Sequence, residues 1–165
     1  MSEEVELRRT RAKADTITLD LARHRLAIVW LGGTSIIIVI LVLQSLLGKY
    51  SDNVQEAWGW LLPTVMPTLG LIITVLGYTA LEPRLSKAVV RRGFFTVSFS
   101  LSVLYIVLVS LTLLIQPFVG ADGEKAVQLM RMSNLWLGPI QGLVAAALGV
   151  LFVSNRSSDS SDGTT

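Results

Sequence analysis

Four long runs of apolar residues constrain most strongly what this chain can fold into. They cover residues 26–47, 58–81, 94–116 and 135–153, and none of them contains Asp, Glu, Lys, Arg or His. At a rise of about 1.5 Å per residue, helices of these lengths match a hydrocarbon core about 30 Å thick. The sequence therefore predicts an all-α integral membrane protein, a four-transmembrane-helix antiparallel bundle.

Basic residues are distributed unevenly over the segments that flank these runs. Eleven of the 14 Lys and Arg residues lie before the first run, between the second and third, or after the fourth. Cytoplasmic segments of membrane proteins carry such an excess of positive charge. Both termini and residues 82–93 are therefore predicted to be cytoplasmic. The first run is too long for a cleaved signal peptide, and with the absence of cysteine this favours a bacterial inner (plasma) membrane.

Three regions follow along the chain. Residues 1–25 form a basic, amphipathic N-terminal arm, in which Thr16–Arg25 is predicted to be helical and to lead into the first span. Residues 26–153 form the transmembrane domain, and residues 154–165, rich in Ser and Asp, are predicted to be a disordered tail. The cytoplasmic basic face comprises Arg8, Arg9, Arg11, Lys13, Arg84, Lys87, Arg91 and Arg92. This face either sets the orientation only, contacts anionic lipid headgroups or binds a cytoplasmic protein.

The second and fourth runs share a sequence pattern. Residues 67–77 and 139–149 both read P-x-x-G-L-[IV]-x-x-x-L-G, and the same offset of 72 residues aligns Gln44 with Gln116. The match reflects either a duplicated two-helix hairpin or coincidence. Two such hairpins would be parallel repeats, related by a pseudo-two-fold axis along the membrane normal.

Small residues recur at helical spacing in three of the runs. Because lipid gives helices no hydrophobic reason to associate, small and polar residues indicate contact faces. The third run carries a stripe made of Ser98, Ser102, Tyr105, Val109, Thr112 and Gln116. The residues predicted to pack helices together are Gly70, Gly77, Gly138, Gly142, Gly149, Ser98 and Ser102.

Polar residues and prolines are concentrated towards the predicted outer half of the membrane. Pro63 and Pro67 lie four residues apart and each lacks a backbone N–H, so they are predicted to bend the second helix. The candidate polar cluster or pore lining consists of Gln44, Thr64, Gln116 and Gln141. These side chains either line a pocket that opens outward or form hydrogen bonds between helices.

Groups that perform chemistry are scarce in this sequence. Tyrosine is the only ionisable residue type inside the runs, His24 is the only histidine, and there is no cysteine. We therefore expect no enzyme activity, and no catalytic residue, cofactor or metal site. Nucleic acid is not expected as a partner, because the basic residues lie among acidic residues and next to lipid.

Two functions remain open. The first is a membrane anchor, assembly or adaptor subunit that contacts the lipid bilayer and binds either a second copy or another membrane or cytoplasmic protein. The alternative is an oligomeric pore, or a membrane-perturbing effector, that passes ions or small solutes.

Overall fold

The computed structural model describes residues 6, 16–81, 89–118 and 123–153, and most of these residues are helical. The four long helices are α2 (Leu19–Leu46), α3 (Val54–Leu81), α4 (Arg92–Ile115) and α5 (Gly123–Val153). By length and composition all four can cross a membrane, which confirms the prediction of transmembrane helices. The short elements are β1 (Thr16–Thr18), η1 (Ser51–Asn53), β2 (Val89–Arg91) and η3 (Gln116–Phe118).

The helices begin earlier than the apolar runs that predicted them. α2 begins at Leu19 rather than residue 26, and α5 begins at Gly123 rather than residue 135. An apolar run indicates the part of a helix that lies in the hydrocarbon core of a membrane. The helix itself can extend beyond this run where its residues pack against the rest of the protein. Leu19, Ala22 and Arg23 are buried, so the first turns of α2 belong to the packed structure.

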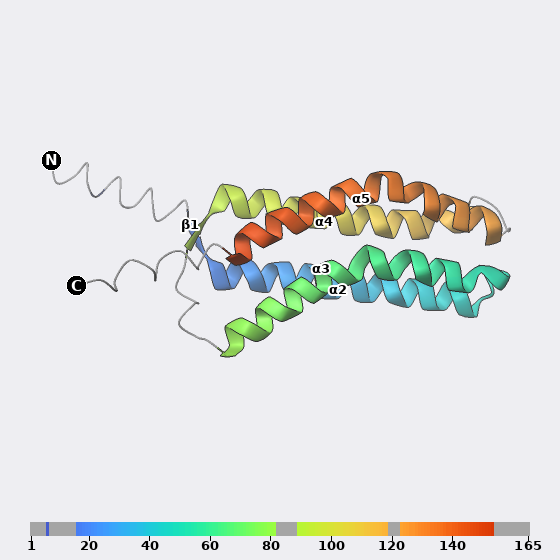
Figure 1. Ribbon diagram of the computed structural model, residues 1–165, viewed down its shortest axis with the longest axis horizontal. Helices are drawn as coiled ribbons and strands as arrows, with labels where there is room; N and C mark the ends of the chain where they lie inside the picture. Colours follow the sequence, from blue (N-terminus) through green and yellow to red (C-terminus); the bar gives the residue numbers. More distant parts are fainter. Residues whose placement is uncertain (1–5, 7–15, 82–88, 119–122, 154–165) are drawn as a thin grey trace, which may run out of the picture.

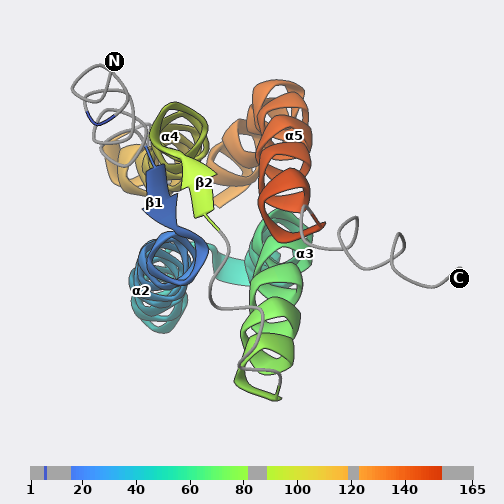
Figure 2. The ribbon, with the colours of Figure 1, turned by 90° about the vertical axis from the view of Figure 1, so that its left-hand side faces the viewer.

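A short antiparallel sheet replaces the beginning of the helix that was predicted over Thr16–Arg25. Thr16 pairs with Arg91, Ile17 with Val90 and Thr18 with Val89. β-Branched residues predominate in both strands and favour extended backbone, which explains why the helix starts only at Leu19. Figure 2 shows the sheet at the ends of α2 and α4, so it ties together the beginnings of these two helices.

Each long helix packs against two others. α2 contacts α3 and α4, and α5 contacts the same two helices from the opposite side. Figure 1 shows α2 and α4 beginning at the end of the molecule that carries the sheet, and α3 and α5 beginning at the far end. In the view along the helices, α2 lies diagonally across from α5, and α3 across from α4 (Figure 2).

This arrangement differs from the expected pseudo-two-fold. A two-fold axis along the membrane normal would place the corresponding helices of two hairpins diagonally, with α2 opposite α4 and α3 opposite α5. Instead α2 lies beside α4 and α3 lies beside α5. The contacts among the described helices therefore do not confirm this axis.

Large side chains fill the centre of the molecule. Trp30 of α2 is fully buried, and its ring lies 5.7 Å from that of Tyr105 on α4. All six residues of the polar and small stripe predicted for the third run, including Ser98 and Ser102, are buried. Gly33 allows the closest approach, because a Cβ placed there would lie 2.7 Å from Cγ2 of Ile106.

Candidate functional site

The glycines that were predicted to pack α3 and α5 do not face the core. Gly70, Gly77, Gly138 and Gly142 are exposed, and Gly149 is half-buried. A Cβ added at any of the five would meet no atom of the described residues within 4 Å. The core-facing residues of these helices are mostly larger, such as Leu61 and Leu148, because large apolar side chains fill space that glycines would leave empty.

A groove of about 520 Å³ runs between these outward-facing surfaces. The α3 side of the groove is lined by Pro67, Thr68 and Leu71. The α5 side is lined by Gly138, Gln141, Gly142, Ala145 and Gly149. The groove thus joins the two segments that share the P-x-x-G-L pattern, and four of its five α5 residues carry no side chain or only a methyl group.

The hydroxyl of Thr68 is the unusual polar group of this groove. Its side chain is only 2% exposed, and Oγ1 has no hydrogen-bond partner among the described residues. Seven serines and threonines of the helices donate to the carbonyl four residues before them: Ser45, Thr64, Thr74, Thr96, Ser98, Ser102 and Thr112. Thr68 therefore lacks the bond that its neighbours make.

The reason lies in the carbonyl that Thr68 would use. The backbone oxygen of Thr64 accepts a hydrogen bond from the Tyr105 hydroxyl at 2.8 Å and from Nε2 of Gln141 at 3.0 Å. A carbonyl oxygen has two lone pairs, so these two bonds leave the Thr64 carbonyl little capacity for a further side-chain donor. The Thr68 hydroxyl is therefore buried without a partner among the described residues.

Pro63 and Pro67 are linked to the same network. Because Pro67 has no N–H, the carbonyl of Pro63 loses its partner within the helix. Nε2 of Gln141 lies 3.4 Å from that oxygen and supplies a donor from α5. Figure 1 shows the Leu81 end of α3 diverging from the other helices.

The other two glutamines of the predicted cluster meet elsewhere, at Tyr50. The Tyr50 hydroxyl donates to Oε1 of Gln44, whose Nε2 donates to the Leu113 carbonyl at 3.2 Å. Oε1 of Gln116 also lies 2.6 Å from this hydroxyl, while Nε2 of Gln116 is buried without a partner. A hydroxyl has one proton, and it is donated to Gln44, so turning the Gln116 amide over lets Nε2 donate to the Tyr50 oxygen.

The predicted polar cluster is therefore two networks rather than one lining. Gln44 and Gln116 meet where α2 and α4 end, whereas Thr64 and Gln141 meet between α3 and α5. The sequence pattern did not single out Tyr50 as a member of the cluster. Its position six residues after Gln44, just past the end of a span, was the available signal.

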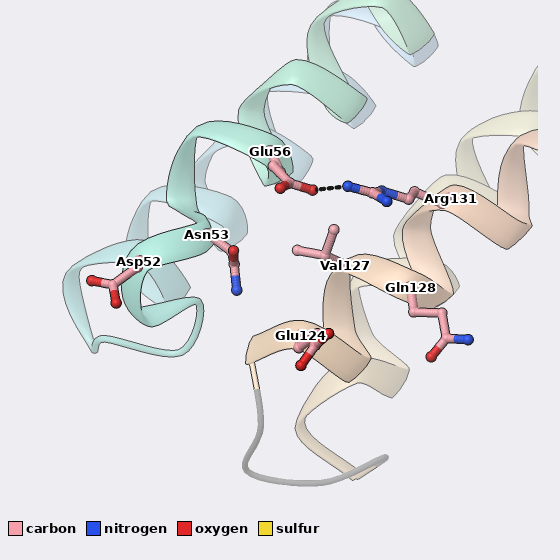
Figure 3. A pocket seen from close by; sticks show the side chains of 7 residues that line it. All are labelled: Asp52, Asn53, Glu56, Glu124, Val127, Gln128 and Arg131. Atoms are coloured by element: carbon pink, nitrogen blue, oxygen red, sulfur yellow. Dashed lines mark hydrogen bonds and ion pairs between the residues drawn. The ribbon is translucent and has the colours of Figure 1, made fainter.

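A second pocket, of about 590 Å³, lies where α3 and α5 begin (Figure 3). It is lined by Asp52, Asn53, Glu56, Glu124, Val127, Gln128 and Arg131. Arg131 of α5 forms an ion pair with Glu56 of α3, the dashed contact in Figure 3. In the part of the chain that the structure describes, no three acidic or His residues are grouped closely enough to hold a metal ion.

The acidic pocket and the groove lie on one face of the helix pair. Glu56 and Pro67 are eleven residues apart, about three helical turns, and Glu124 and Gly142 are eighteen apart, or five turns. Each pair therefore points in nearly the same direction. We call this surface, from the acidic pocket to the groove, the α3–α5 face.

Only part of the predicted basic face falls within the described residues. Arg91 and Arg92 are exposed at the sheet end of the molecule, and Nε of Arg92 lies 3.4 Å from the Thr16 carbonyl oxygen. The remaining members, Arg8, Arg9, Arg11, Lys13, Arg84 and Lys87, lie outside the described residues, as does the tail at 154–165.

Four helices that are long and apolar enough to span a bilayer indicate a helical membrane protein. Comparison with protein-family models, with curated proteins and with solved structures finds no match.

Proposed function

We propose that this chain is a non-enzymatic membrane anchor or assembly subunit, without cofactor or metal. In this proposal its helices form an antiparallel bundle across a bacterial inner membrane, with both termini in the cytoplasm. The excess of basic residues in the terminal segments and in residues 82–93 supports that orientation. The bundle holds the chain in the membrane and presents one face to another membrane protein.

The outward-facing small residues on α3 and α5 carry this proposal. Small residues let helix backbones approach closely within lipid, and helix–helix interfaces in membranes are enriched in them. Here Gly138, Gly142 and Ala145 are exposed beside a groove rather than packed against a helix of the same chain. A surface of this kind fits contact with a helix from outside the chain.

The shared P-x-x-G-L pattern fits this proposal without the two-fold axis. A duplicated hairpin would give α3 and α5 the same small-residue face, and these helices contact each other. Duplication remains part of the proposal, although the two walls of the groove use different positions of the shared pattern.

Crosslinking in membranes tests the assembly function. The chain has no cysteine, so Ala145→Cys places a single thiol in the groove and Ile36→Cys places one on the exposed side of α2. With a bifunctional thiol–amine reagent, we expect adducts of higher mass from Ala145→Cys that disappear when Gly142→Leu is added. Ile36→Cys is expected to give none of these adducts. Equal adducts from both positions, or none from Ala145→Cys, would contradict the proposal.

The pore remains the second candidate, and one observation favours it. Nε1 of Trp30 and Oγ1 of Thr34 lie on successive turns of α2, are buried, and have no partner among the described residues. Such atoms can bind internal water. Against a conducting path, the large side chains of Trp30, Ile37 and Tyr105 are fully buried in the interior.

Flux from liposomes that contain the purified chain separates the two candidates. The assembly function predicts the same ion and small-dye release as from empty liposomes. Release that exceeds this control, and that changes in Thr34→Val, would move the function to a pore.

A further inference from the structure

We infer that the end of the molecule that carries the sheet binds the headgroup of an anionic phospholipid through Arg91 and Arg92. This inference goes beyond the proposed assembly function and does not depend on it. Three observations carry it: the exposure of these two side chains, the apolar surface directly beside them, and the difference in charge between the two ends of the molecule.

Arg91 and Arg92 lie together where β2 ends and α4 begins. Arg91 pairs with Thr16 of β1, and Nε of Arg92 donates to the Thr16 carbonyl at 3.4 Å. Both arginine side chains are exposed, and neither forms an ion pair within the described part of the chain. The contact with Thr16 uses one of the five N–H donors of Arg92. Its two terminal nitrogens are left for a phosphate group, which guanidinium binds in a bidentate manner.

The surface of α4 next to these arginines is apolar. Phe94 and Val97, within the first two turns of the helix, are 37% and 63% exposed. In a helix that spans a membrane, exposed side chains of this kind contact acyl chains. The arginines immediately before them then lie at the depth of the headgroups, where Arg places its charged end. Lipid phosphates are the acceptors at that depth, and this placement favours a lipid over a soluble protein as the partner.

The charges of the two ends favour an anionic lipid at the end with the sheet. The first two turns of α2 and the start of α4 carry one acidic and four basic residues: Asp20, Arg23, Arg25, Arg91 and Arg92. The far end carries three of each sign among the described residues: Asp52, Glu56, Glu124, Lys49, Lys125 and Arg131. Basic residues near a membrane surface attract anionic lipid, so the excess of positive charge gives the first end the stronger preference.

Native mass spectrometry of the full chain tests this inference. The chain is equilibrated in detergent micelles with equal amounts of phosphatidylglycerol and phosphatidylcholine, and the lipid that it retains is identified by mass. Both lipids have a phosphate group and the same acyl chains, but only phosphatidylglycerol has a net negative charge. We expect the chain to retain at least about fivefold more phosphatidylglycerol, which is about the factor that one basic residue near a membrane surface contributes.

Matched pairs of substitutions locate the binding. Arg91→Gln with Arg92→Gln removes two exposed positive charges and is expected to lower the preference to at most about twofold. Lys49→Gln with Lys125→Gln removes the same charge from the far end and should leave the preference unchanged. Arg91→Lys with Arg92→Lys retains the charge and should keep most of the preference. Circular dichroism should show the same helix content in all three variants.

Inorganic phosphate distinguishes a lipid headgroup from a free anion. We expect excess inorganic phosphate to displace no more phosphatidylglycerol than sodium chloride of the same ionic strength does. The reason is that contacts of the acyl chains with Phe94 and Val97 add to lipid binding and are not available to a free anion. Greater displacement by phosphate would overturn the assignment of a lipid.

Four other results would overturn the inference. These are equal retention of the two lipids, a preference that survives Arg91→Gln with Arg92→Gln, an equal loss in the far-end pair, and loss of the preference in the lysine pair. Equal retention would leave these arginines the role of setting the orientation or of binding a protein. The Ala145→Cys adducts do not depend on these arginines, so the assembly function and the lipid site can fail separately.

Discussion

At the scale of single residues, the buried polar groups show what holds this structure in one arrangement. Tyr50 connects the end of α2 to the end of α4 through Gln44 and Gln116, and Tyr105 connects α4 to the carbonyl of Thr64 on α3. Removal of the two hydroxyls has different consequences for their hydrogen-bond partners. Gln116 loses its partner when the Tyr50 hydroxyl is removed, whereas the Thr64 carbonyl keeps Gln141 when the Tyr105 hydroxyl is removed.

Tyr50→Phe is therefore expected to destabilise the chain more than Tyr105→Phe. Leaving a buried polar group unsatisfied costs about 1–3 kcal/mol, whereas loss of one bond to a carbonyl that keeps another costs about 1 kcal/mol. The free energy of unfolding, measured by titration with sodium dodecyl sulfate in mixed micelles, provides the comparison. An equal loss in both variants would show that Gln116 finds another partner.

Burial also raises the pKa of Tyr50 above its ordinary value. The neutral phenol is thus favoured in the folded chain, and this contribution is fully present below the unfolded pKa of about 10. Above that pH the unfolded chain loses the proton first, so the free energy of unfolding is expected to fall as pH rises. Tyr50→Phe should show a smaller decrease between pH 8 and pH 11, and an identical decrease would contradict the assignment.

At the scale of elements, α3 is a helix whose missing backbone donors are replaced from a neighbouring helix. Pro67 leaves the Pro63 carbonyl without a partner inside α3, and Gln141 of α5 supplies the donor. The same amide binds the Thr64 carbonyl, which removes that acceptor from Thr68. Tyr105 and Gln141 together occupy the acceptor that the Thr68 hydroxyl would otherwise use.

Restoring the backbone N–H at residue 67 should reduce the contribution of Gln141 to the free energy of unfolding. We expect Gln141→Leu to cost about 1–2 kcal/mol in the natural chain, and about 1 kcal/mol less in a Pro67→Ala background. The reason is that the N–H of residue 67 then bonds to the Pro63 carbonyl. A double-mutant cycle of unfolding free energies measures the coupling, and its absence would show that Gln141 does not act through Pro63.

Adjacent glycines of α2 are expected to respond in opposite directions. A methyl group at Gly33 meets Cγ2 of Ile106 at 2.7 Å, whereas one at Gly32 meets no described atom within 4 Å. Gly33→Ala should therefore destabilise the chain by about 1–3 kcal/mol through overpacking, and Gly32→Ala should be neutral or stabilising. Ile106→Ala should relieve the effect of Gly33→Ala, and unfolding of the three variants in micelles tests this expectation.

At the scale of the whole molecule, the arrangement of the helices places the sheet and the α3–α5 face on different parts of the surface. The sheet joins the beginnings of α2 and α4, while α3 and α5 share the face with the groove and the acidic pocket. The sheet end carries Arg91 and Arg92, whereas the far end carries Asp52, Glu56 and Glu124 together with Lys49, Lys125 and Arg131.

The proposed orientation has a direct test. A reporter fused after Thr165, and one fused after Arg91, should both be active only as cytoplasmic reporters, whereas one inserted after Asp52 should be active only outside the cytoplasm. The excess of basic residues on the cytoplasmic side is the physical reason. A cytoplasmic signal after Asp52 would contradict the orientation.

The sequence by itself determined the number of spans, because only an uncharged helix of this length satisfies its backbone within lipid. It also selected the buried face of α4, where small and polar residues alternate with large ones. The tertiary structure decided which helices are neighbours and which glycines face outward. Small residues at helical spacing indicate a contact face, but the pattern is the same whether the contacting helix belongs to this chain or to another. Only the packing of Trp30, Tyr105 and their neighbours left the glycines of α3 and α5 outside the core.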